Sequence, residues 1–282
     1  MDRFADIKST LLEYAHRDGE IHGVITVGSA ARTKEPADEY SDLVIVTDTP
    51  EKWISGEYPA RLGEICISFT EKTVIGSTER RVLYNGSRDV DFVALTPEMC
   101  LSALESGEAA LLLGRGYTVL YDGCGLAEGL RPISMPVRPL PSCAELMNLT
   151  NDYFFHTVWT AKKILRGEYW TAILCLDAYL KVNLQEMLAF RAGLDGRDTW
   201  HGGRFLEKWA DPEAVQTMKD CFARYGRADL VRALTASAEL YARIAREAFE
   251  RAGFSGYPEK AEKTALDYLK EKFGENRPRS GK

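Results

Sequence analysis

The stretch that decides the fold is VGSAARTKEPADEYSDLVIVTD, residues 27–48. It has the pattern of a strand end, a turn at Gly28 and Ser29, a polar loop, and a second strand that opens with Asp42. A Gly-Ser turn after a strand can offer backbone N–H groups and a hydroxyl to a phosphate. Gly-Ser is also a common turn without any ligand, so this pattern alone leaves both interpretations open.

Short runs of β-branched and aromatic residues flank this stretch and end at Gly, Asp or Asn. They predict strands at residues 21–28, 42–48, 64–70, 80–86, 89–96 and 117–123. Apolar residues at helical spacing predict a first helix over residues 2–17. Residues 96–116 begin with Thr-Pro and end at Gly, which predicts one further helix there.

The character of the chain changes at a proline-rich segment. Pro132, Pro136, Pro139 and Pro141 lie within ten residues, a density that excludes helix and central strand and predicts an extended connector. Four segments with helical apolar spacing follow, at residues 142–167, 169–193, 227–253 and 258–274. We therefore predict an α+β protein. It has a mixed β-sheet domain with flanking helices over residues 1–135 and an all-α helical bundle over residues 136–282.

Composition narrows the class of protein and of partner. The 282 residues carry a net charge of −6, so the chain as a whole lacks the positive charge typical of nucleic-acid-binding proteins. A negative net charge favours a cationic small molecule as the substrate. The six cysteines are scattered without a CxxC pair, which argues against a zinc site and a disulfide framework. The charged amphipathic start and the absence of any run of 18 apolar residues predict a cytoplasmic protein without a membrane partner.

Acidic residues open two of the predicted strands. Asp42 begins one, and Asp91 lies in the later run RDVDFVAL, with Asp89 two residues before it on the same face. Mg²⁺ takes hard oxygen ligands, commonly one or two carboxylates together with phosphate oxygens and water. Two such acids on adjacent strands at one end of a sheet would provide a magnesium site.

These residues carry a family resemblance. GSAARTKEPADEYSDLVIV followed by RDVDFVAL resembles the nucleotidyltransferase signature of the streptomycin (aminoglycoside 6-) adenylyltransferases. The resemblance continues through TVWTAKKILRGEYWTAILCLDAYLKVNLQEMLAFRAG, GGRFLEKW and SGYPEKAEK, and so covers nearly the whole chain. It implies a nucleotidyltransferase-like domain on a helical bundle. It also implies transfer of AMP from Mg-ATP to a hydroxyl of a cationic aminoglycoside such as streptomycin, as in antibiotic resistance.

The resemblance assigns roles to individual residues. Gly28 and Ser29 match the phosphate-binding turn, and Asp42 and Asp91 match the first and third acids that hold the metal. Three positions depart from the pattern. The second metal acid falls at Val44, the arginine that follows Gly-Ser falls at Ala30, and the base for the acceptor hydroxyl falls at Leu174.

Asp177 lies one turn beyond Leu174 and is the candidate catalytic base if the helix is shifted. The structural alternative is an ion pair with Lys181, four residues on, at the surface of one helix. In the loop before Asp42, Glu35, Asp38 and Glu39 could attract an amine-rich substrate or could simply be solvated.

Two functions follow from these departures. The first is an aminoglycoside adenylyltransferase of weakened or altered activity. The alternative is a catalytically impaired relative that binds a nucleotide or a cationic small molecule without turnover.

Overall fold

The computed structural model describes residues 4–31, 40–73, 76–130, 133–134, 139–199 and 202–274. The chain divides into two compact units, Met1–Arg138 and Pro139–Lys282. The boundary predicted between residues 135 and 136 lies outside the described residues.

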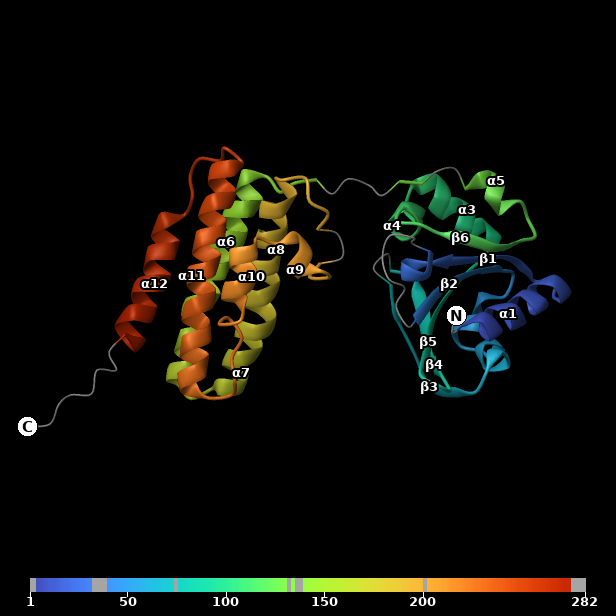
Figure 1. The fold of residues 1–282 in the computed structure, drawn as a ribbon, viewed down its shortest axis with the longest axis horizontal. Coiled ribbons are helices and arrows are strands. Elements are labelled where there is room, and N and C mark those ends of the chain that lie inside the picture. Colours follow the sequence, from blue (N-terminus) through green and yellow to red (C-terminus); the bar gives the residue numbers. More distant parts are fainter. Residues whose placement is uncertain are drawn as a thin grey trace, which may run out of the picture. The chain divides into compact units, whose positions relative to one another are not determined.

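A six-stranded mixed sheet forms the centre of the first unit (Figure 1). Its strand order is β3-β4-β5-β2-β1-β6; β2 and β5 are parallel and the other neighbours are antiparallel. The strands are β1 Ile21–Val27, β2 Tyr40–Thr47, β3 Ile65–Lys72, β4 Thr78–Tyr84, β5 Arg88–Leu95 and β6 Thr118–Asp122. Each of these strands overlaps a predicted run. The predicted α+β class with a mixed sheet is confirmed.

Short helices flank this sheet. They are α1 Ala5–Arg17, η1 Gly28–Ala31, α2 Pro50–Ile54, η2 Tyr58–Leu62, α3 Pro97–Ser106, α4 Ala109–Leu113 and α5 Leu126–Gly129. The prediction of one continuous helix over residues 96–116 was wrong. Thr96 caps α3 by accepting the Met99 N–H at 3.2 Å, but Gly107 adopts φ +82° and ends the helix before α4 begins.

Alternation along the central strands separates two apolar layers. Leu43 and Ile45 of β2 pack into a cluster with α1 and α2, whereas Val44 and Val46 pack into a second cluster with α3, α4 and α5. Because successive side chains of a strand point to opposite faces, Asp42 lies on the face of Val44.

The second unit is helical. Its helices are α6 Cys143–Leu165, α7 Tyr169–Leu174, η3 Cys175–Tyr179, α8 Leu180–Gly193, α9 Leu206–Trp209, α10 Pro212–Met218, α11 Arg227–Arg251 and α12 Glu259–Phe273. The long helices α6, α8 and α11 pack against one another around one apolar core (Figure 1). Ser142 and Glu145 form a capping box at the start of α6, so this helix begins where the proline-rich segment ends.

A π-helical turn, η3, interrupts the helix predicted over residues 169–193. Each π turn adds a residue relative to the α-helical repeat, so it rotates the side chains that follow it. Hydrophobic spacing did not predict this turn.

Candidate functional site

The turn that follows β1 requires glycine. Gly28 adopts φ +72°, and a Cβ added there would overlap the carboxylate of Asp42. The register explains the contact, because Asp42 is the partner of Val27, the residue before Gly28, in the antiparallel β1–β2 pair. Ser29, the next residue of the turn, is buried. The structure therefore brings the predicted phosphate turn and the first predicted metal acid together.

Asp42 and Asp91 are direct neighbours in the sheet. They are register partners in the parallel β2–β5 pair, so their Cα atoms lie on strands about 4.8 Å apart and their side chains share one face. Asp89 is the register partner of Tyr40 and is half-buried. The two predicted metal acids are therefore brought together.

Asp91 has a strongly perturbed environment. Asp91 is only 5% exposed, and Arg81 Nη2 lies 3.1 Å from Asp91 Oδ2. Burial raises the pKa of Asp91 to about 7; Arg81 opposes this shift, while the charge of Asp42 adds to it. Oδ1 of Asp91 is buried without a hydrogen-bond partner among the described residues.

These features fit a divalent cation. An orphaned carboxylate oxygen of Asp91 and the Asp42 carboxylate held against the Gly28 turn supply two hard oxygen ligands on one face. No group of three or more His, Cys, Asp or Glu side chains suited to a metal occurs within the described part of the chain. Two carboxylates alone would leave most ligand positions of such an ion to be filled from outside the chain.

Val44 belongs to the apolar layer. It is 4% exposed and packs in the cluster that contains Ile25, Val27 and Val93. No oxygen ligand is therefore available from this position. The side chain of Ala30 lies outside the described residues, as do Arg32, Glu35, Asp38 and Glu39.

Arg81 was not singled out from the sequence. Its side chain also contacts Glu71 at 2.7 Å and Glu79 at 3.4 Å, so one guanidinium joins three carboxylates. The predicted run RRVLYNG placed Arg81 on a strand, but only the strand register shows that Arg81 lies opposite Asp91.

Asp177 lies on the π turn and is held by other parts of the helical unit. Its Oδ2 accepts the Ala223 N–H at 3.2 Å, and Lys181 Nζ lies 3.6 Å from its Oδ1. The predicted surface ion pair was wrong in its location. The Lys181 side chain is only 11% exposed, and its ammonium donates to Ser237 Oγ at 3.0 Å. Burial lowers the pKa of Lys181, and the charge of Asp177 opposes this shift.

Leu174, where the resemblance places the base, is 51% exposed at the end of α7. The π turn directly follows it and contains Asp177.

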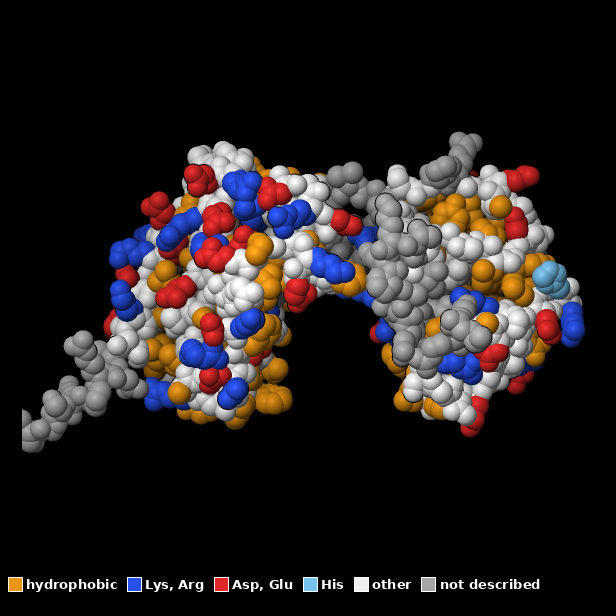
Figure 2. Space-filling model, viewed as in Figure 1, with side chains coloured by type: hydrophobic (Ala, Val, Ile, Leu, Met, Phe, Trp, Pro, Cys, Tyr) orange, Lys and Arg blue, Asp and Glu red, His pale blue; other side chains and the backbone are white. Residues whose placement is uncertain are grey.

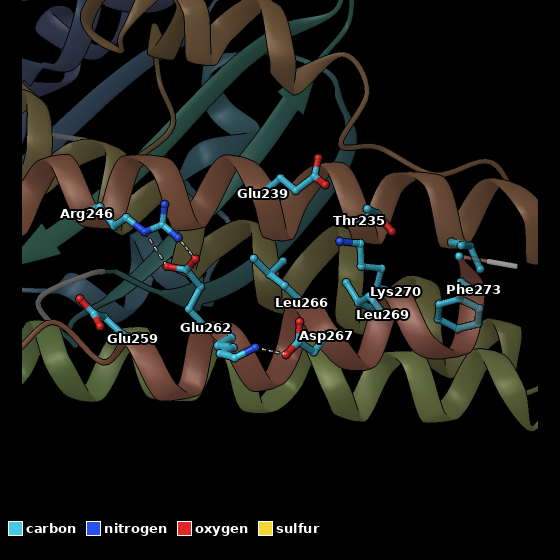
Figure 3. Close-up of a pocket in the computed structure, with 13 residues that line it drawn as sticks. Thr235, Glu239, Arg246, Glu259, Glu262, Leu266, Asp267, Leu269, Lys270 and Phe273 are labelled. Atoms are coloured by element: carbon cyan, nitrogen blue, oxygen red, sulfur yellow. Dashed lines mark hydrogen bonds and ion pairs between the residues drawn. The ribbon is translucent and has the colours of Figure 1, made fainter.

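A groove of about 710 Å³ lies between α11 and α12 (Figure 3). Arg246 and Glu262 point toward one another across it and form an ion pair, and Tyr257 donates to Glu262 at 2.7 Å. None of the predicted site residues lines this groove.

Charged side chains of both signs are mixed on the drawn face of the helical unit (Figure 2). Figure 2 shows Lys and Arg side chains interspersed with Asp and Glu there, without a stripe of one sign. Within the described residues, no helix is long and apolar enough to span a membrane.

Comparison with known proteins shows to which family the chain belongs. The model of the family described as streptomycin adenylyltransferase matches residues 1–272. This chain belongs to the streptomycin adenylyltransferase family. The predicted resemblance is therefore confirmed, and members of this nucleotidyltransferase family typically use ATP with a divalent metal.

Two solved structures are similar to this streptomycin adenylyltransferase family member. An aminoglycoside 6-adenyltransferase from Bacillus subtilis is 13% identical, with 96% of this chain and 98% of that chain covered and a TM-score of 0.47. A nucleotidyltransferase-like protein from Exiguobacterium sibiricum 255-15 is 12% identical, with 95% and 88% covered and a TM-score of 0.37. No curated protein matches the chain.

Proposed function

We propose that this chain is an aminoglycoside O-adenylyltransferase, which transfers AMP from Mg-ATP to a hydroxyl of a streptomycin-like aminoglycoside and releases pyrophosphate. The observation that carries the proposal is the pairing of Asp42 with Asp91 on adjacent strands, beside a turn that requires glycine. Membership of the family supplies the reaction class.

Asp42 and Asp91 would hold the magnesium ion, and Gly28 and Ser29 would bind the phosphates of the nucleotide. When bound, the metal neutralises the triphosphate and the charge that develops on it during transfer. The Asp42 carboxylate approaches Gly28 so closely that a Cβ at this position would overlap it. A nearby divalent charge favours the ionised form of Asp91, whose pKa is about 7 in the metal-free chain.

The acceptor hydroxyl must lose a proton as it attacks the α-phosphate. Asp177 stays the predicted base for that proton, and general-base catalysis typically contributes about 10²–10⁴-fold to the rate. The net charge of −6 favours a cationic acceptor such as an aminoglycoside.

The test is incubation of the chain with ATP, Mg²⁺ and streptomycin, with pyrophosphate release as the readout. We expect release that depends on the aminoglycoside and is lost in D42N. The absence of release across several aminoglycosides would defeat the proposal.

The packing of Val44 in the apolar layer favours a second candidate function, binding without turnover. A missing metal carboxylate that costs about 4 kcal/mol would lower the rate about 10³-fold, while the turn and the two acids could still bind the nucleotide. Calorimetric titration with Mg-ATP separates the two functions, since binding without pyrophosphate release supports the second and robust turnover excludes it.

A further inference from the structure

One row of register partners crosses five strands at the candidate site. Phe69 of β3, Arg81 of β4, Asp91 of β5, Asp42 of β2 and Val27 of β1 are successive partners. Partners that lie directly opposite in a sheet share one face. The guanidinium of Arg81 is therefore on the same face as the two acids of the proposed metal seat.

Arg81 occupies a position among three carboxylates. Its Nε lies 2.7 Å from Glu71 Oε1 and 3.4 Å from Glu79 Oε1, and its Nη2 lies 3.1 Å from Asp91 Oδ2. The three acids come from three strands, β3, β4 and β5. The single positive charge of Arg81 thus offsets part of the repulsion among these three acids.

Asp91 has two oxygens with different surroundings. Arg81 contacts Oδ2, whereas Oδ1 is buried and has no hydrogen-bond partner in the part of the chain that the structure describes. The Asp91 side chain is 7% exposed and that of Arg81 is 42% exposed. Oδ1 is therefore the Asp91 oxygen that no described side chain occupies.

We propose that Arg81 is a positioning residue that limits the Asp42–Asp91 seat to a single divalent ion. It holds Asp91 as a one-oxygen ligand and fills the cation position among Glu71, Glu79 and Asp91. Val44 removes a carboxylate beside Asp42, and the arginine charge takes the place of a second ion on the other side of Asp91. The inference rests on the proposed function to the extent that Asp42 and Asp91 bind the metal.

Removal of the guanidinium should convert its position into a second ion site. With the guanidinium between them, these three acids are not placed to hold an ion. Without it, they are free to close around a hard divalent ion, which prefers such oxygen ligands. Lysine keeps the positive charge, so R81K should still exclude a second ion. Its ammonium cannot reproduce the planar, bidentate hydrogen bonding of the arginine guanidinium.

The experiment counts Mn²⁺ bound per chain by electron paramagnetic resonance of the free ion, with Mn²⁺ alone as the probe. We expect one ion for the wild type and R81K, two for R81M, and one again for R81M/E71Q/E79Q, in which Asp91 alone remains of the three acids. R80M is the matched control. The neighbouring Arg80 contacts Ser68 Oγ and the Gly56 carbonyl rather than these acids, so R80M should bind one ion.

Two results would overturn the inference: R81M that binds one ion with the wild-type affinity, or wild type that itself binds two. The second result needs no variant, so misfolding of R81M leaves the inference testable. If the wild type binds no Mn²⁺, both the arginine role and the metal seat are wrong. Aminoglycoside-dependent pyrophosphate release tests the proposed function separately, because it does not count ions.

Discussion

Asp91 should make the stability of the metal-free protein depend on pH. Its folded pKa of about 7 lies above the ordinary value near 3.8, so the folded state binds more protons than the unfolded state between these values. Stability therefore falls as pH rises from about 4 to about 7, by at most about 1.4 kcal/mol for each pH unit. Urea unfolding in a chelator at pH 5 and pH 8 should show this fall, and D91N should reduce it. An equal pH dependence in D91N would contradict this assignment.

Substitution of Val44 by aspartate shows whether the apolar layer can accept a second metal-binding acid. V44D places a carboxylate in a buried cluster near Asp42, and an uncompensated buried charge costs about 3–5 kcal/mol of unfolding free energy. Mg-ATP should restore part of this stability and raise pyrophosphate release.

V46D is the matched control for V44D, because Val46 lies on the same strand and in the same cluster, two residues further from Asp42. We expect V46D to lose similar stability without rescue by Mg-ATP. Urea unfolding with and without Mg-ATP measures both variants, and equal rescue would show that residue 44 does not face the metal seat.

At the scale of elements, Asp177 connects the π turn to the segment before α11. Its hydrogen bond to Ala223 and its proximity to Lys181 give it a structural role. A structural role alone predicts that D177N lowers the melting temperature by a few degrees, since Lys181 loses its charge partner. As the base, Asp177 would instead have a catalytic effect, and D177N would lower turnover about 10²–10⁴-fold.

The two roles of Asp177 separate in paired measurements of melting temperature and kcat. We expect D177N to lower both. An unchanged kcat would remove Asp177 as the base, and an unchanged melting temperature would mean that its contacts add little stability. D220N serves as control, because Asp220 is an exposed acid of the same segment.

The elements were predictable to the extent that local spacing determines them. β-branched and aromatic runs between turn residues indicated all six strands, because strand and turn preferences are local properties of the sequence. The break at Gly107 and the π turn were missed, since both interrupt a pattern whose apolar spacing continues across them.

At the scale of the whole molecule, the candidate site depends on strand register, which a single sequence does not contain. Asp42 and Asp91 could be placed on strands, but that these strands are parallel neighbours emerged only from the sheet order. Arg81 was missed for the same reason. The family, by contrast, was recognisable from motifs spread over the whole chain, and the family model matches residues 1–272.

The central claim is that Asp42 and Asp91 bind a metal-bound nucleotide. Calorimetric titration of the full chain with ATP, with and without Mg²⁺, tests it most directly when wild type, D42N and D48N are compared. Asp48 follows the same strand but bonds to His22, so D48N is a matched control. The account predicts that ATP binding requires Mg²⁺, weakens at least about tenfold in D42N, which is about 1.4 kcal/mol, and is unchanged in D48N. Equal ATP affinity in D42N and wild type, or binding that ignores Mg²⁺, would contradict it.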